Sequence, residues 1–386
     1  MRFYYFLRNK LIILSAVIFY PILRFWFGRR EAMWDGEVRR ARGEFRILVI
    51  PQLTRIGDLV CAMPVFRAIK QRYPRSFLAV MMTGKIAPLV KNNPYIDEIV
   101  QYSTKDLMGV IKSVQARYFD WSFALAPSSL VGAIMAWGLV PRRAKIVRAG
   151  KPWGEAVTDG LATHPFLYKH GDYLPGEYLK MLKFIGIDNV NTEKEVFVTQ
   201  EGEKKAEAFL PPDNKPLVGI SITAGNKIKE WGDEKFIELA KRILDKYKNA
   251  KIILIGSKND KSRIEAVEGA LPSGVALSAT DFTLEELPSL IKRLDLYIGV
   301  DTGPIYIAEA LGTPLVDIIG PVDPSEQPPC NAPKSVCVMP EGDIKPSSFV
   351  LKRPGKNHRA ALEATSVDSV MEAVATFLER LNEVSR

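Results

Sequence analysis

Val300 to Pro321 reads VDTGPIYIAEALGTPLVDIIGP, and local rules predict from it a turn, a short helix and a following strand. Pro304 suits the first turn of the helix, and Gly312 with Pro314 ends it. The aliphatic run PLVDIIG after the helix is typical of a buried strand. The stretch therefore predicts a helix enclosed between two strands, which is the repeating unit of a parallel α/β sheet.

The same alternation extends over most of the chain from Phe45 onward. Runs such as FRILVIP, FLAVMMT and WSFALAP precede segments of helical period in the first half, and LVGISIT, KIILIGS and LYIGV do so in the second. The alternation weakens between Gly150 and Lys215, so two Rossmann-like halves are predicted, with a boundary near Asp188 to Pro216. Neither half contains the G-x-G-x-x-G phosphate turn of dinucleotide-binding oxidoreductases, which argues against hydride transfer.

These patterns divide the chain into five segments. The prediction is a hydrophobic and basic segment at residues 1–44, an N-terminal Rossmann-like domain at 45–190, a linker at 191–215, a C-terminal Rossmann-like domain at 216–365, and a final amphipathic helix at 366–386. The core of each domain is expected between its sheet and its helices.

The apolar run LIILSAVIFYPILRFWF, from Leu11 to Phe27, predicts a membrane-associated helix. A helix that spans a bilayer needs about 20 apolar residues, so this run is slightly short, and Pro21 should kink or break it. A monotopic anchor and a single span are the leading interpretations. A signal peptide and a buried helix are the others, although no small-residue cleavage pattern follows the run.

The formal net charge of +9 is concentrated beside this run. Met1 to Arg46 contains ten Lys or Arg and four Asp or Glu, which supplies +6 of the total. Anionic headgroups attract basic residues by about 1 kcal/mol each, so residues 1–46 predict a membrane surface as a partner. Nucleic acid is not an expected partner, because no binding motif accompanies the charge. More arginines follow the apolar run than basic residues precede it, which favours the cytoplasmic face of the inner membrane for the rest of the chain.

The three cysteines and three histidines show no metal-ligand spacing and no disulfide framework. Cys330 and Cys337 are close enough in sequence to lie near one another. A reducing compartment and a site without metal are therefore the expectation.

The loop that follows the first strand reads QLTRIGD. Ligands of open α/β sheets bind beyond the carboxyl ends of the strands, so this loop is a candidate site. Gly57 is expected to allow a tight turn, and Asp58 begins the next helix. Asp58 could cap that helix, or it could accept a proton from a substrate hydroxyl.

A second strand-to-helix loop lies in GISITAGNKIKEWGDEKF. Thr223 and Lys229 could hold a phosphate, because a lysine beside backbone amides neutralises anionic oxygens. The plainer interpretation is a solvated basic loop, with Trp231 packed as a lid and Asp233 as the N-cap of the next helix.

The third loop is the turn before the helix of the opening stretch. Asp301 or Thr302 is expected to cap that helix, and Gly303 lets the backbone approach a ligand. Because small residues at a helix N-terminus expose N–H groups and the positive end of the helix dipole, these three residues predict a diphosphate site.

Taken in order, the three stretches resemble glycosyltransferase family 9, the ADP-heptose:lipopolysaccharide heptosyltransferase family. The resemblance covers roughly Phe45 to Pro324 and is carried by RIGDLVCAMPVFRAIKQRYP, by KEW and by VDTGPIYIAEALGTPLVDIIGPVDP. It implies a GT-B fold, in which two Rossmann-like domains face each other across a cleft. The N-terminal half would hold the acceptor and the C-terminal half the nucleotide sugar. The chemistry implied is inverting and independent of metal, with no cofactor.

The resemblance also implies roles for individual residues. Asp58 would be the general base, with Arg55 and Gly57 on the acceptor side. Tyr306 stands where the family commonly has a histidine, so this donor contact is expected to differ. The residues implied on the donor side are Thr223, Lys229, Asp301, Thr302, Gly303 and Tyr306.

The expected function is transfer of a sugar, heptose from ADP-heptose, to a lipid-linked saccharide such as lipopolysaccharide core. Three alternatives stay open at this point: a GT-B transferase that uses another nucleotide sugar, a nucleotide-sugar epimerase, and an inactive membrane-tethered GT-B scaffold. An epimerase would convert the donor without an acceptor, and a scaffold would bind it without turnover.

Overall fold

The computed structural model describes residues 2–23, 25–26, 41–148, 158–188, 190–212, 215–320, 322–342 and 360–384. It divides into two compact units, Met1–Glu193 (unit 1) and Lys194–Arg386 (unit 2). Helix α9 (Gln200–Phe209), which lies in the segment assigned to a linker, belongs to unit 2.

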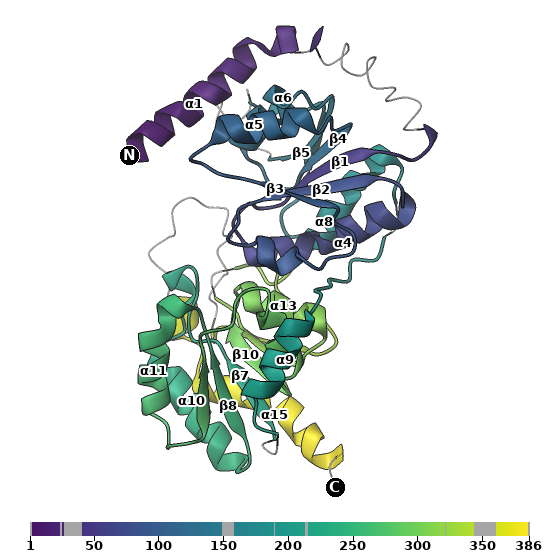
Figure 1. The fold of residues 1–386 in the computed structure, drawn as a ribbon. Coiled ribbons are helices and arrows are strands. Elements are labelled where there is room, and N and C mark those ends of the chain that lie inside the picture. Colours follow the sequence, from purple (N-terminus) through teal and green to yellow (C-terminus); the bar gives the residue numbers. More distant parts are fainter. Residues whose placement is uncertain are drawn as a thin grey trace. The chain divides into compact units, whose positions relative to one another are not determined.

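Unit 1 is a parallel sheet with helices on both faces. Its six strands lie in the order β3-β2-β1-β4-β5-β6, which is the strand order of a Rossmann fold. Helices α5 and α6 cover one face, and α4 and α8 cover the other (Figure 1). The elements are α1 (Arg2–Ile18), β1 (Arg46–Ile50), α4 (Ile56–Arg72), β2 (Phe77–Met82), β3 (Glu98–Gln101), α5 (Leu107–Ala116), β4 (Trp121–Ala124), α6 (Ser129–Trp137), β5 (Arg142–Val147), β6 (His164–Leu167) and α8 (Leu174–Lys180).

Unit 2 repeats this topology with β7 in the place of β1. Its six parallel strands lie in the order β12-β11-β10-β7-β8-β9. The elements after α9 are β7 (Leu217–Ile220), α10 (Asp233–Lys246), β8 (Lys251–Ile255), α11 (Lys261–Gly269), β9 (Ala276–Ala279), α12 (Leu287–Lys292), β10 (Leu296–Val300), α13 (Gly303–Leu311), β11 (Leu315–Ile318), β12 (Ser335–Val338), α14 (Ala360–Glu363) and α15 (Val367–Val384). The predicted pair of parallel Rossmann-like domains is therefore confirmed.

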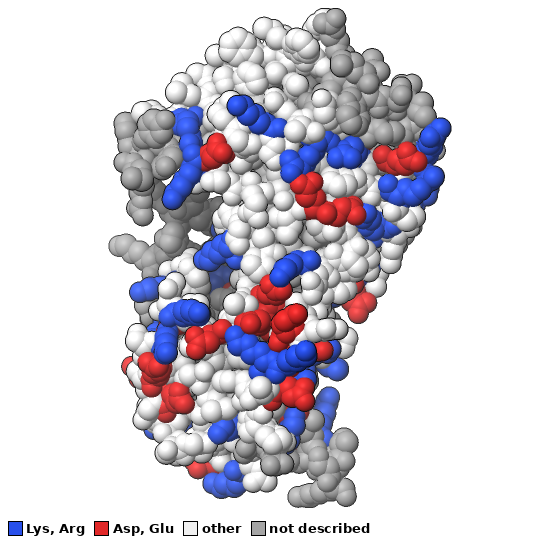
Figure 2. All heavy atoms as spheres, viewed as in Figure 1, with Lys and Arg blue, Asp and Glu red and all other residues white. Residues whose placement is uncertain are grey.

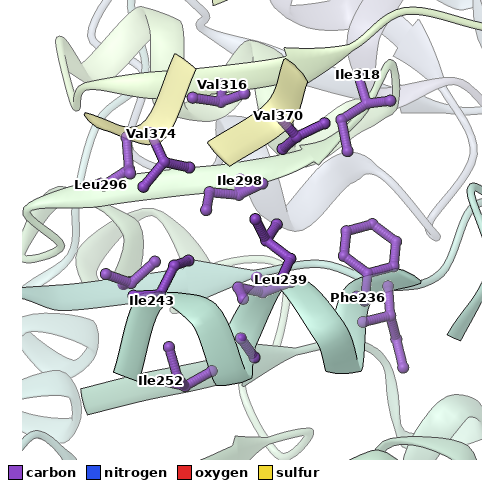
Figure 3. Close-up of a cluster of buried hydrophobic side chains, with 14 of the residues drawn as sticks. Phe236, Leu239, Ile243, Ile252, Leu296, Ile298, Val316, Ile318, Val370 and Val374 are labelled. Atoms are coloured by element: carbon purple, nitrogen blue, oxygen red, sulfur yellow. The ribbon is translucent and has the colours of Figure 1, made fainter. Parts of the chain in front are cut away.

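The core of unit 2 follows the two-residue period of its strands. Alternate residues, such as Leu296 and Ile298 of β10, point to one face and are fully buried. Figure 3 shows them meeting Leu239 and Ile243 of α10 and Val370 of α15. The opposite face of β10 and β11 carries two buried polar residues, Tyr297 and Asp317, and Asp317 lies near the candidate site.

Helix α1 ends at Ile18, three residues before Pro21, and a short helical turn continues beyond it. Within the described residues, no helix is both long enough and apolar enough to cross a bilayer. Five of the basic residues counted beside the apolar run lie outside the described part of the chain: Arg24, Arg29, Arg30, Arg39 and Arg40.

The structure corrects the expectation of no disulfide. Cys330 and Cys337 are joined, with their Cα atoms 5.2 Å apart. Cys337 lies on β12, beside Asp317 of β11, and the chain between the two cysteines turns back to start that strand. Two cysteines seven residues apart match no common disulfide framework, so the sequence predicted only that the two thiols lie near one another.

Candidate functional site

Two of the donor-side residues form an ion pair where β10 ends. Lys229 Nζ donates a hydrogen bond to the Asp301 carboxylate and another, 2.8 Å long, to the Asp301 carbonyl oxygen. The Asp301 side chain is 3% exposed and that of Lys229 is 17% exposed. The ammonium group is thus fixed by a buried anion while part of it still reaches solvent, as a group that binds an anionic ligand requires.

Tyr306 completes this cluster from within α13. Its hydroxyl donates to the second carboxylate oxygen of Asp301, and its side chain is buried. The residue that departs from the family pattern therefore holds Asp301 in place, and Asp301 in turn holds Lys229.

The start of α13 adjoins the ion pair. Thr302 is the N-cap residue, but its side chain makes no capping bond and donates instead to the Val300 carbonyl at 3.1 Å. Gly303 is the first residue of the helix, and Pro304 occupies the first turn as predicted. At the other end Gly312 adopts a left-handed conformation with φ 67°, so the predicted helix end is also confirmed.

Glu230 holds the loop that contains Lys229 in place through two contacts. Glu230 accepts a hydrogen bond from the Ala224 N–H at 3.4 Å and pairs with Arg263 at 2.9 Å. Arg263 also binds Asp233 at 2.7 Å. Asp233 is consequently not the N-cap of α10; that position is Gly232, whose φ of 113° suits glycine.

Trp231 is a core residue and not a lid over a solvated loop. It is 4% exposed, its Nε1 donates to the Thr365 carbonyl at 3.0 Å, and its ring meets Phe236 edge to face. Thr223, the other residue predicted on this loop, is partly exposed and follows β7, the strand next to β10. The carboxyl ends of β7 and β10 therefore bring Thr223 and Asp301 to the same edge of the sheet.

A second buried ion pair supports α13, and the sequence gave no indication of it. Lys194 Nζ pairs with the Glu309 carboxylate at 2.6 Å, and the same ammonium lies 5.2 Å from the centre of the Tyr306 ring. Burial raises the pKa of the Glu309 carboxyl, and the Lys194 charge opposes that rise. Lys194 thus packs on Tyr306, the residue that positions Asp301.

Asp317 is the most unusual group near the site. It lies in the middle of β11, is fully buried, and neither of its carboxylate oxygens has a hydrogen-bond partner among the described residues. Burial raises the pKa of Asp317 well above its ordinary value, and the charge of Asp301 raises it further. Burial at this position therefore favours the protonated form of the Asp317 carboxyl.

Replacing Asp317 with Asn should stabilise unit 2 at high pH. A raised folded-state pKa means that the folded protein retains a proton that the unfolded chain releases above about pH 4, so stability declines as pH rises toward the folded pKa. Because Asn cannot ionise, the stability of the Asp317→Asn variant does not decline in this way. We expect the Tm of Asp317→Asn to match wild type near pH 5 and to exceed it by about 2–6 °C near pH 8.

Thermal unfolding at the two pH values tests this expectation. Asp245→Asn, which changes an exposed carboxylate of α10, is the matched control and should leave the pH dependence unchanged. A variant less stable than wild type at both pH values would show that the Asp317 carboxylate is needed in its charged form.

In unit 1, Asp58 is the third residue of α4. The N-cap position is Arg55, which is exposed and makes no side-chain capping bond. Gly57 lies buried within the first helical turn, so the expected tight turn at Gly57 is wrong. An acid in the first turn is stabilised by the helix dipole, and the Asp58 side chain remains partly exposed.

Tyr178 of α8 is the neighbour of Asp58 that sequence reasoning missed. Its side chain is buried, and burial raises the pKa of its hydroxyl well above the ordinary value. The negative charge of Asp58 raises it further, while Arg55 lowers it. Asp58, Arg55 and Tyr178 therefore form one electrostatic group, assembled from α4 and α8.

Comparison with known proteins identifies the class of this chain. Residues 178–348, which include the Lys229 loop and the start of α13, match the model of glycosyltransferase family 9 (heptosyltransferase). This part of the chain is similar to glycosyltransferase family 9. The predicted resemblance is thus confirmed, and the protein is a glycosyltransferase.

Relatives of this glycosyltransferase match over most of their length. Lipopolysaccharide heptosyltransferase 3 of Escherichia coli (strain K12) is 23% identical over 279 residues, which cover 69% of this chain and 80% of the relative. The structure of E. coli ADP-heptose lps heptosyltransferase II superposes with a TM-score of 0.71 at 18% identity, over 87% of this chain and 99% of the other. E. coli heptosyltransferase WaaC with ADP-2-deoxy-2-fluoro heptose gives a TM-score of 0.65 at 13% identity, over 86% and 99%. The fold is therefore GT-B.

The predicted site residues of this glycosyltransferase fall into two groups. Lys229, Asp301 and Tyr306 are in direct contact in unit 2, where Thr223, Thr302 and Gly303 adjoin them in the fold. Asp58, Arg55 and Gly57 lie together at the start of α4 in unit 1. Among the described residues there is no group of three or more His, Cys, Asp or Glu suited to a metal ion. The roles of all these residues remain predictions.

Proposed function

We propose that this glycosyltransferase transfers heptose from ADP-heptose to a lipid-linked saccharide of the lipopolysaccharide core type. The observation that carries the proposal is the Lys229–Asp301 ion pair beside the N-terminus of α13, in the part of the chain that matches the family. The identity of the donor sugar is inferred from the names of the relatives, one of whose structures contains an ADP-heptose analogue.

The proposed reaction is a direct, inverting displacement. Asp58 accepts the proton of the acceptor hydroxyl as its oxygen forms a bond to the anomeric carbon. The bond between that carbon and the β-phosphate oxygen breaks on the opposite face, and ADP leaves with the electron pair. Lys229 and the first N–H groups of α13 stabilise the negative charge that develops on the diphosphate.

Arg55 gives the acceptor side its specificity in this proposal. Its exposed guanidinium lies three residues before Asp58, at the N-cap of α4. Arginine binds phosphate and carboxylate groups in a bidentate manner, so an acidic group on the acceptor fits this position. The acceptor would then present its hydroxyl to Asp58 while its charge is held by Arg55.

A transfer assay tests the proposed function. Purified protein is incubated with ADP-heptose and a core acceptor that lacks the terminal heptose, and product is measured by mass spectrometry. We expect an acceptor mass increase of one heptosyl residue and none with a UDP-sugar or GDP-sugar. ADP should likewise raise the Tm more than UDP or GDP, because only a bound nucleotide stabilises the folded state.

Two outcomes would contradict the proposal. Conversion of the donor in the absence of any acceptor would indicate an epimerase. Stabilisation by ADP-heptose without turnover on any acceptor would indicate a binding scaffold.

The enzyme is proposed to act at the cytoplasmic face of the inner membrane, where its lipid-linked acceptor would lie. The basic excess of residues 1–46 supports this location, because the cytoplasmic leaflet carries a negative surface potential.

A further inference from the structure

Helix α1 has two apolar faces, and unit 1 covers one of them. Ala16 and Leu23 are buried against Ala133 and Ala136 of α6 and against Leu161. The other face carries large apolar side chains at intervals of three or four residues, so they form one stripe along the helix and the turn after it. The members of this exposed stripe are Leu7, Leu11, Leu14, Ile18 and Ile22, which are 46–64% exposed.

Polar contacts fix α1 on unit 1. Trp137 Nε1 at the end of α6 donates to Ser15 Oγ at 3.3 Å, and the buried Arg143 guanidinium donates to the Tyr20 hydroxyl at 3.1 Å. Nearer the N-terminus, Arg8 donates to the Lys105 carbonyl at 2.9 Å. These contacts occur along the whole helix, so the exposed stripe has a set orientation on unit 1.

The charge of the sequence that contains the stripe suits an anionic lipid surface. The first 30 residues contain six Lys or Arg and no Asp or Glu. Figure 2 shows a surface over α1, near the top of the view, with few charged side chains. Phe19, Phe25 and Trp26 are also 45–62% exposed, and aromatic side chains favour the boundary between headgroups and acyl chains. A protein partner would be expected to bring acids of its own, whereas a bilayer supplies both the negative charge and the apolar layer.

We propose that the exposed stripe of α1 lies in the surface of an anionic bilayer, with the helix axis parallel to it. Because α1 packs against α6, unit 1, which contains Asp58, would then lie on the membrane in one fixed orientation. This inference rests on the membrane location in the proposed function, but it assigns the contact to named side chains and to lipid headgroups, not to the acceptor.

Vesicle flotation without acceptor tests the inference. The full chain is mixed with vesicles of phosphatidylcholine alone or with 30% phosphatidylglycerol (about one anionic lipid in three, a leaflet charge that attracts basic segments). We expect wild type to float with the anionic vesicles, and Leu14→Glu with Ile18→Glu to lower the bound fraction at least about ten-fold. Leu167→Glu, at a residue of β6 that is 60% exposed, is the matched control and should float as wild type does.

A transfer assay with two acceptors separates this inference from the proposed function. The double variant should use a delipidated, soluble acceptor as well as wild type does and lose activity only on acceptor embedded in vesicles. Equal flotation of wild type and the double variant would overturn the inference, as would a wild type that forms a dimer through α1 and ignores anionic vesicles. Flotation as expected, together with no transfer to the soluble acceptor, would leave the inference standing and contradict the proposed function.

Discussion

Asp58→Asn is expected to lower kcat for sugar transfer by about 10³-fold, within the range that a positioned general base contributes. Asn keeps the size of the side chain and cannot accept the proton of the acceptor hydroxyl. Asp58 is in the first turn of α4 and is partly exposed, so the substitution should change the Tm little. The affinity for the donor should also stay near that of wild type, because the donor-side residues lie in unit 2.

Asp106→Asn is the matched control for this experiment. Asp106 is the N-cap of α5 in the same unit and accepts a hydrogen bond from Gly109 at 2.8 Å, a role that Asn fills equally well. Initial rates at saturating donor and acceptor give kcat for each variant. Near-wild-type turnover of Asp58→Asn would contradict its assignment as the base, and an equal loss in both variants would point to a general effect on unit 1.

Lys229→Met is expected to weaken donor binding by about 10- to 100-fold, the value of a charge-assisted hydrogen bond. Methionine retains the length and apolar stem of the side chain but removes the charge. The same change leaves the nearly buried Asp301 carboxylate with one partner fewer, so a loss of about 1–3 kcal/mol in unfolding free energy should accompany it.

A double variant separates these two effects. Lys229→Met with Asp301→Asn removes both charges, so stability should recover while donor affinity stays low. Lys227→Met is the matched control, since Lys227 is exposed and lies on the same loop. Calorimetric titration with ADP measures affinity. Wild-type affinity in Lys229→Met, or an equal loss in Lys227→Met, would exclude a specific phosphate contact.

The fold could be predicted because each of its elements is encoded locally. Strands such as β1 and β10 are buried on both faces and therefore appear as continuous aliphatic runs, while α13 carries its own start and end in Pro304 and Gly312. The disulfide was missed because it depends on where β12 places Cys337.

The candidate site could be predicted only in part. Sequence order indicated that Lys229 and Asp301 follow strands whose carboxyl ends share one edge, and the structure joins them. It did not indicate Tyr178 beside Asp58, or Lys194 beside Glu309, because the members of each pair are distant in sequence and meet only in the folded unit. The unusual environment of Asp317 was not predicted, because Asp317 lies in an aliphatic run that otherwise predicts an ordinary buried strand.

The packing of α1 against α6 also has a consequence during synthesis, because the residues that cover α1 are synthesised after it. Helix α1 leaves the ribosome before α6, which begins at Ser129, and Leu161 comes later still. At about 5–20 residues per second, roughly 7–28 s pass before the surface that covers Ala16 and Leu23 exists. Throughout that interval the nascent chain exposes both apolar faces of α1, and only the folding of unit 1 reduces them to one.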